Sequence, residues 1–222
     1  MSARPEAPNP SSLPGTNPSA TLRVALALAV AALVLTGCRD KSAPDTVVPA
    51  GFVAVRDADA GFAMGVPAEW LQIPLPRNLD VFNEESRKLL AVNTDLLPAI
   101  NQARQVLQYG GKLMAVSADG RSRVNLTIDK AQEKDLEEIA RLAVPLLEEG
   151  GATNVRQEPG TTGAGPALKL TFNYPLPARG DTVEIADEVQ YYVLHKGNSV
   201  VITVINGSAE LAQTIADTLR LR

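Results

Sequence analysis

The stretch VQYYVLHKGNSVVITVI, residues 189–205, contains two strands joined by a tight turn. In the first strand, Val189, Tyr191 and Val193 alternate with Gln190, Tyr192 and Leu194, which predicts two different faces. Lys196-Gly197-Asn198 supplies the turn. The second strand, 199–205, is almost continuously β-branched. A strand without a polar face belongs in the middle of a sheet that is covered on both sides.

The segments upstream also alternate in the manner of strands. Residues 168–174 place leucine and aromatic side chains on one face and polar side chains on the other. Residues 112–117 and 123–130 predict a hairpin around Ala118-Asp119-Gly120. In the second strand of this hairpin, one face is apolar and the other polar; the polar side chains are Arg123, Asn125, Thr127 and Asp129. Residues 52–55 and 62–66 predict two short strands around a turn at 57–61.

Helical spacing of apolar residues predicts the remaining elements. Residues 79–108 have this spacing, but Pro98 cannot lie in the middle of a helix, so Asn93-Thr94-Asp95 predicts a break between two helices. Asp135 with Glu138 resembles a capping box that begins a helix ending at Glu149. Ser208 caps a last helix, with Leu211, Ile215 and Leu219 on one face.

This order of elements predicts the α+β class: an α/β/α sandwich with a mainly antiparallel sheet and helices on both faces. A domain of about 170 residues buries roughly 70% of the surface of its unfolded chain, so it needs no disulfide or metal to fold.

The first residues differ in composition from the rest. Residues 1–20 are rich in proline and serine and contain no aromatic residue, which is typical of disorder. Arg23 precedes an uninterrupted apolar run, 24–35. The run is shorter than the roughly 20 residues of a transmembrane helix, but it matches the apolar core of a signal peptide.

The apolar run ends in Leu35-Thr36-Gly37-Cys38, which resembles the lipobox of bacterial lipoprotein signal peptides. The resemblance implies that a signal peptidase recognises Leu35, Thr36 and Gly37 and cuts before Cys38. It also implies a diacylglyceryl thioether on Cys38, with acyl chains such as palmitate. An ordinary cysteine at a helix end, or an uncleaved anchor, is the alternative. We expect three parts: a signal peptide with a disordered extension at 1–37, a lipidated tether at 38–50 and a folded domain at 51–222.

Composition excludes several classes of function. The 222 residues have a formal net charge of −4 and a pI near 5.1, whereas nucleic-acid binders normally carry a basic patch. A single cysteine forms neither an internal disulfide nor a multi-cysteine zinc site. The single histidine, His195, argues against His-rich metal sites and a His-based catalytic centre.

Residues 59–70, DAGFAMGVPAEW, resemble the start of Mog1/PsbP-like domains, many of which carry a similar aspartate, Gly-Phe, strand, proline and tryptophan. Residues 191–204 resemble the late hairpin of that family. Together with the lipobox, the chain is similar to actinobacterial lipoproteins of the LpqN type. The resemblance implies an extracytoplasmic binding or adaptor domain without shared catalytic residues.

Several side-chain patterns have both a chemical and a plain interpretation. Asp57 and Asp59 suggest calcium, but the further oxygen ligands of an EF-hand loop are missing, which favours an acidic turn. A catalytic His195 would need a nucleophile, and the sequence contains no Gly-x-Ser-x-Gly nucleophile elbow. This favours an exposed hairpin histidine.

The other patterns are acidic or rich in glycine. Glu184, Asp187 and Glu188 could supply the two carboxylates of a glycosidase, but we interpret them as solvated charges at a sheet edge. The acidic residues of 133–149 indicate either a solvent-exposed helix face or a docking face for a basic partner. Residues 160–165, GTTGAG, do not open a helix, which favours a flexible strand connection over a phosphate site.

We therefore expect no catalytic, cofactor or metal site. The predicted function is a non-catalytic binding or adaptor module, anchored through Cys38 at the extracytoplasmic face of the cell membrane. Its predicted partner is an envelope or secreted protein and not a nucleic acid. The alternative is a carrier of a lipid or another apolar ligand, which requires an apolar cavity of roughly 300 Å³ or more.

Overall fold

The computed structural model describes residues 42–76, 78–177 and 183–222. Within these residues, one large antiparallel sheet has the spatial order β3-β4-β5-β9-β8-β7-β6. Its strands are β3 (Leu71–Gln72), β4 (Gly111–Val116), β5 (Arg123–Lys130), β6 (Thr153–Thr162), β7 (Gly165–Pro177), β8 (Val183–His195) and β9 (Asn198–Ile205). A small antiparallel sheet has the order β1-β2-β10, with β1 (Phe52–Asp57), β2 (Phe62–Pro67) and β10 (Arg220–Leu221). The helices are α2 (Leu79–Val92), the short 3-10 helix η1 (Thr94–Leu96), α3 (Leu97–Gln108), α4 (Leu136–Glu149) and α5 (Ala209–Asp217).

The central strand of the large sheet is β9, as its β-branched sequence predicts. It pairs with β5 on one side and β8 on the other, and β8 and β9 form the predicted hairpin. Val200, Ile202 and Val204 are at most 1% exposed. The α+β class and the mainly antiparallel sheet expected from the sequence are therefore confirmed.

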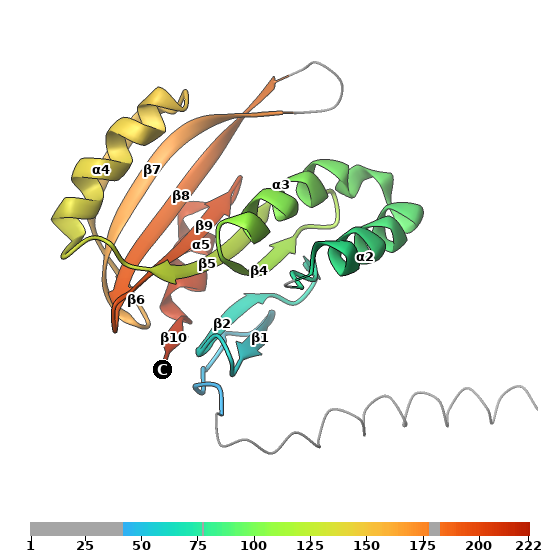
Figure 1. The fold of residues 1–222 in the computed structure, drawn as a ribbon, viewed down its shortest axis with the longest axis horizontal. Helices are drawn as coiled ribbons and strands as arrows, with labels where there is room; N and C mark the ends of the chain where they lie inside the picture. Colours follow the sequence, from blue (N-terminus) through green and yellow to red (C-terminus); the bar gives the residue numbers. More distant parts are fainter. Residues whose placement is uncertain (1–41, 77, 178–182) are drawn as a thin grey trace, which may run out of the picture. The chain divides into compact units, whose positions relative to one another are not determined.

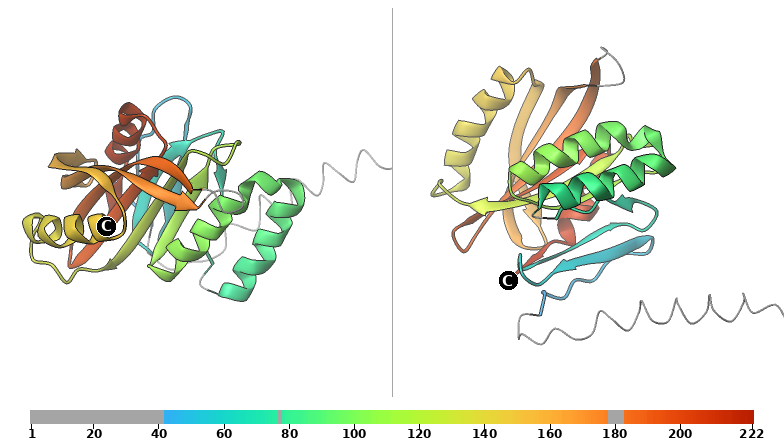
Figure 2. Two further views of the ribbon diagram at one scale, coloured as in Figure 1. Left: turned by 90° about the horizontal axis from the view of Figure 1, so that it is seen from above. Right: turned by 45° about the vertical axis from the view of Figure 1, so that its right-hand side comes forward.

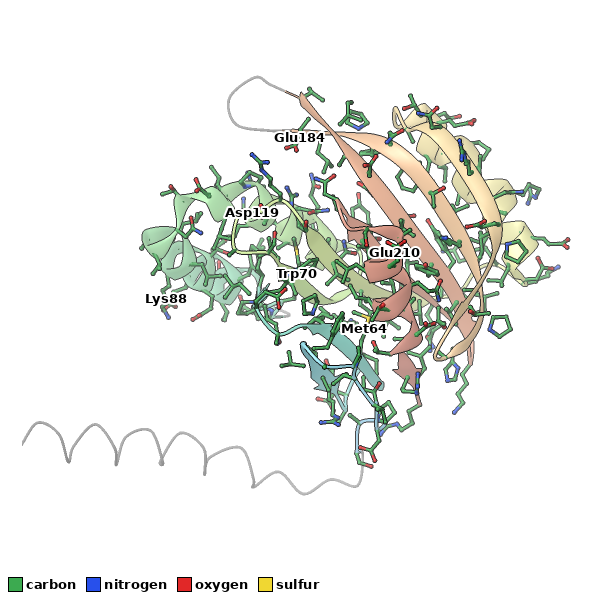
Figure 3. All side chains as sticks on the ribbon, turned by 180° about the vertical axis from the view of Figure 1, so that it is seen from behind. Met64, Trp70, Lys88, Asp119, Glu184 and Glu210 are labelled. Atoms are coloured by element: carbon green, nitrogen blue, oxygen red, sulfur yellow. The ribbon has the colours of Figure 1, made fainter. Side chains whose placement is uncertain are left out.

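One face of the large sheet packs against α5 and the small sheet. Leu126, Tyr191 and Ile202 come from the large sheet, and they share a core with Met64 of β2 and Ile215 of α5. Figure 3 shows Met64 beside α5, on the side of the molecule opposite to that seen in Figure 1. This layer therefore combines one helix with three strands.

The opposite face of the large sheet packs against α2 and α3 near β4 and against α4 near β7 (Figures 1 and 2). Met114 and Val116 of β4 share a core with α2 and α3, whereas Leu168 and Leu170 of β7 share a separate core with α4. Between these two cores lie the middle strands of the sheet, β5, β9 and β8. The helices on this face therefore flank the central strands.

The predicted helix boundaries are confirmed at their caps. Asn93 ends α2 and its side chain accepts from the backbone N–H of Asp95, at 2.9 Å, where the next helical turn begins. Asp135 accepts from the N–H of Glu138 at 2.8 Å, and Ser208 from that of Leu211 at 3.1 Å. Each bond satisfies one of the unpaired donors in a first helical turn.

Two sequence-based expectations for the late part of the fold are wrong. The last helix ends at Asp217, so Leu219 lies beyond it, fully buried, just before β10. The segment 160–165 is no flexible connection: it contains the end of β6, a tight turn and the start of β7. The turn packs closely, because the N–H of Gly163 donates to the carbonyl of Ala216 at 2.9 Å.

The structure describes the second part of the predicted tether, residues 42–50, and this part contacts the folded domain. Thr46 is only 8% exposed, and its hydroxyl donates to the carbonyl of Thr218 at 2.5 Å. Arg222 donates to the carbonyl of Ser42 at 3.1 Å. The predicted lipobox residues Leu35, Thr36, Gly37 and Cys38 lie outside the described residues.

Candidate ligand-binding cleft

A cleft of about 440 Å³ lies between α3 and α4, above the middle strands of the large sheet. One wall is the side of α3 that carries Leu97, Asn101, Gln102 and Gln105. The other wall is formed by Leu146 and Leu147 of α4. The floor comes from β5, β7 and β8 and consists of Arg123, Phe172, Tyr174, Leu176, Glu188 and Gln190.

Strand register explains why these side chains share one face. Arg123 pairs with Ile205, Ile205 with Glu188, and Glu188 with Phe172, so the four form a row across β5, β9, β8 and β7. Directly paired residues of antiparallel strands point to the same side of a sheet. Because Val116 of the α3 core pairs with Arg123, this row faces the helices that form the cleft.

The next row of the same face is also polar. It contains Asn125, Thr203 and Gln190, and the first two are 5% and 8% exposed. The carbonyl oxygen of the Gln190 side chain accepts from the hydroxyl of Tyr192 at 2.5 Å. The middle of the sheet is therefore lined by hydrogen-bonding groups, although it lies between two apolar cores.

Arg123 supplies the positive charge of the floor. Its side chain is only 7% exposed, and its guanidinium donates to the carbonyl of Gly120 at 3.1 Å and to the side-chain oxygen of Gln102 at 2.9 Å. Burial lowers the pKa of Arg123, while the charges of Glu184 and Glu188 raise it. These two acceptors hold the guanidinium toward α3 and the β4–β5 turn.

Glu188 supplies the negative charge. It is 7% exposed, and within the described part of the chain its carboxylate neither accepts a hydrogen bond nor forms an ion pair. Burial raises the pKa of Glu188 from 4.5 to about 7, against the opposing effect of the Arg123 charge. A buried carboxylate without a partner is costly, and strongly perturbed carboxyl groups are typical of functional sites.

The rim of the cleft is more apolar than its floor. Leu97 on α3 is 45% exposed and Leu146 on α4 is 66% exposed, and Leu176 of β7 adds a partly buried side chain. This arrangement suits a ligand that has a polar group to place at depth and an apolar part to leave near the surface.

A second hollow, of about 710 Å³, lies between α4 and the strands β6 and β7. Its charged lining residues Glu137, Arg141 and Glu158 are not buried, and Leu136, Ala140, Val144 and Leu168 of its apolar lining belong to the α4 core. It therefore lacks the buried polar groups that distinguish the cleft between α3 and α4.

The structure separates the other sequence-predicted candidates from the cleft. Asp57 accepts from the N–H of Ala60 at 2.8 Å in the predicted acidic turn. His195 does not line the cleft; it is half-buried rather than exposed, and its Nε2 atom has no hydrogen-bond partner among the described residues. Among those residues, no group of three or more metal-ligating side chains comes together.

The prediction of solvated charges on β8 is wrong at one position. Glu184 and Asp187 are exposed, and Glu184 lies near the end of the β7–β8 hairpin (Figure 3). Glu188 is buried, because it shares the sheet face of Gln190 and Tyr192 and lies between α3 and α4. The sequence shows that Glu188 shares a strand face with Gln190 and Tyr192. It does not show that α3 and α4 flank this face.

Comparisons with known proteins find matches among solved structures. No protein-family model matches the chain, and no curated protein sequence matches it either. The chain is similar to the solution structure of cyanobacterial PsbP (CyanoP) from Synechocystis sp. PCC 6803. Their sequences are 11% identical, the match covers 85% of this chain and 99% of the other, and the TM-score is 0.47. The LpqN-type assignment stays a prediction.

No helix within the described ranges is both long and apolar enough to cross a membrane.

Proposed function

We propose that this protein is a lipid-anchored binding module on the extracytoplasmic face of the cell membrane, and that the cleft between α3 and α4 is its ligand site. The observation that supports the ligand site is the buried polar floor, with Glu188 and Arg123 on one row of the sheet. The volume of about 440 Å³ lies within the usual range for small-molecule sites.

The lining favours an amphiphilic ligand over a purely apolar one. A simple hydrocarbon would offer neither a hydrogen bond nor an opposite charge to the Glu188 carboxylate of the floor, which costs free energy. A molecule with a polar head and an apolar tail would satisfy the floor and cover Leu97 and Leu146 at the rim. A lipid carrier is therefore still an alternative, with the polar head of the lipid at the floor of the cleft and its tail at the rim.

A binding role fits the residues of the cleft better than a catalytic one. Its described lining contains no serine, cysteine or histidine that could act as a nucleophile or carry a proton to one. The proposed protein partner from the envelope or the secreted space would then receive or present the ligand at the membrane.

The proposed anchor would keep the domain close to the bilayer. Ser42, where the chain already contacts Arg222, lies four positions after Cys38. A chain spans at most about 3.6 Å per residue, so acylation of Cys38 would hold Ser42 within about 14 Å of the modified cysteine.

Replacing Cys38→Ala is expected to release the protein from the membrane, because the acyl chains supply the anchoring energy. Fractionation of cells and labelling with a fatty-acid analogue measure the effect. Label and membrane retention are both expected to be lost in the variant. An unchanged membrane fraction would contradict the anchor.

The ligand site is tested with single-chain amphiphiles that share an octyl tail, octyl glucoside and octyltrimethylammonium, below their micellar concentrations. Calorimetric titrations use the full chain with Cys38→Ser, so that no acyl chain competes. Gln105→Trp places a large side chain at the wall of the cleft, whereas Gln108→Trp changes an exposed residue of α3 that does not line it.

At least one amphiphile is expected to bind the parent chain and Gln108→Trp equally well, and Gln105→Trp about tenfold more weakly or worse, which equals about 1.4 kcal/mol. Equal affinity for all three proteins, or binding by none of them, would contradict the proposed site.

A further inference from the structure

The Glu188 carboxylate, which faces the cleft and has no hydrogen-bond or ion-pair partner among the described residues, indicates what the ligand must supply. Arg123 lies two strands away across Ile205, and its guanidinium is already used by Gly120 and Gln102. No ion pair joins Arg123 to Glu188. Because an unpaired buried carboxylate is costly, a group that brings positive charge and N–H or C–H donors to this point would gain most from binding.

Two aromatic rings lie on the same side of the cleft as this carboxylate. Phe172 is the direct cross-strand partner of Glu188, and Tyr174 is the next residue on that face of β7. Their rings meet edge to face, with centroids 6.3 Å apart and planes at 80°. Aromatic faces attract organic cations, most strongly where water is excluded.

We propose that the α4 side of the cleft is a site for an organic ammonium group, with Glu188 as its counter-ion and Phe172 and Tyr174 as its aromatic walls. The proposal rests on the proposed function, since it names the ligand chemistry of the same cleft. The apolar part of the ligand would lie along Leu146 and Leu176 toward the rim.

Other charged ligands fit these side chains less well. An anionic head would be repelled by the Glu188 carboxylate. Two nitrogens of the Arg123 guanidinium already donate to protein acceptors. A divalent metal ion such as calcium requires six or more oxygen ligands, and among the described lining residues Glu188 is the single carboxylate. An ammonium group needs one carboxylate and a ring surface, which is what this side offers.

Binding of an ammonium group should depend on the charge state of Glu188. Among the described residues, the charged or titratable groups around it are Arg123 of β5, Tyr174 of β7 and, along β8 itself, Tyr192 and Glu184. The side chains that α3, α4 and β9 contribute here are uncharged. Since the pKa of Glu188 is about 7, the fraction of carboxylate rises about tenfold between pH 6 and pH 8.

The test compares octyltrimethylammonium with octyl glucoside by calorimetric titration of the full chain with Cys38→Ser at pH 6 and pH 8. In the parent chain, affinity for the ammonium amphiphile is expected to rise about tenfold over this range, and affinity for the glucoside is expected not to rise. Glu188→Gln should remove the pH dependence and weaken ammonium binding about tenfold or more at pH 8. Glu184→Gln, an exposed carboxyl on the same strand, should change neither.

The outcomes separate the two proposals. If glucoside binds and is blocked by Gln105→Trp, but ammonium binding is the same at both pH values or in Glu188→Gln, the ammonium site is wrong and the cleft remains a ligand site. If Gln105→Trp affects neither amphiphile, both proposals are wrong.

Discussion

Glu188→Gln is expected to stabilise the folded protein by about 3 kcal/mol at pH 8 and to leave its stability unchanged near pH 4. Burial raises the pKa of Glu188 from 4.5 in the unfolded chain to about 7 in the folded one. The folded chain therefore holds its proton more tightly, and stability falls as the pH rises from about 4.5 to about 7. The difference between these pKa values corresponds to about 3 kcal/mol. Glutamine resembles the protonated acid in shape and cannot ionise, so it removes this loss.

Urea unfolding at pH 4, 6 and 8 measures the effect. The gain of Glu188→Gln over the parent should be absent at pH 4, partial at pH 6 and complete at pH 8. Glu184→Gln is the matched control, because Glu184 is exposed on the same strand, and its stability should follow that of the parent. A Glu188→Gln variant no more stable than the parent at pH 8 would show that the carboxylate is already compensated in the folded state.

Gly163→Ala is expected to destabilise the protein by about 3 kcal/mol. A Cβ atom at this position would lie 2.6 Å from the carbonyl oxygen of Leu219, and closer still to the carbonyl oxygen of Asp217 and a guanidinium nitrogen of Arg220. Backbone atoms cannot move away as a flexible side chain can, so the β6–β7 turn and the end of α5 would have to separate. Overpacking of this kind typically costs 1–3 kcal/mol.

Chemical denaturation at neutral pH measures this loss, with Gly197→Asn as the control. Gly197 also lies in a hairpin turn, but no atom comes within 4 Å of a Cβ built there. Its φ of +74° is one that asparagine tolerates, so the control should cost less than about 1 kcal/mol. Equal losses for the two variants would mean that Gly163 matters only as a turn residue.

Local patterns predicted the parts of the fold that local interactions determine. The β-branched run of β9 predicted a central strand, and Asn93 predicted the break between α2 and α3, because burial on both faces and helix capping depend on neighbouring residues. The end of α5 was not predictable in this way. Leu219 continues the helical spacing, but pairing of β10 with β2 takes the chain out of the helix after Asp217.

The cleft depends on contacts between distant segments, which explains why only part of it was predicted. The polar face of β5, with Arg123 and Asn125, was visible as alternation in the sequence. Glu188 is separated from Arg123 by 65 positions along the chain, and β9 brings the two onto one row. Only the placement of α3 and α4 on either side of this row turns an apparently solvated carboxyl into a buried one.

The most direct test of a binding cleft with Glu188 at its floor is a pH titration of the Glu188 side-chain carboxyl carbon by NMR, with its signal assigned from Glu188→Gln. In the free full chain, the carboxyl is expected to titrate with a pKa of about 7. With saturating octyltrimethylammonium, the bound cation should favour the carboxylate and lower this pKa to about 5 or below. A pKa near 4.5 in the free protein, or one that the amphiphile does not change, would contradict a buried Glu188 carboxylate that serves as the counter-ion of the ligand.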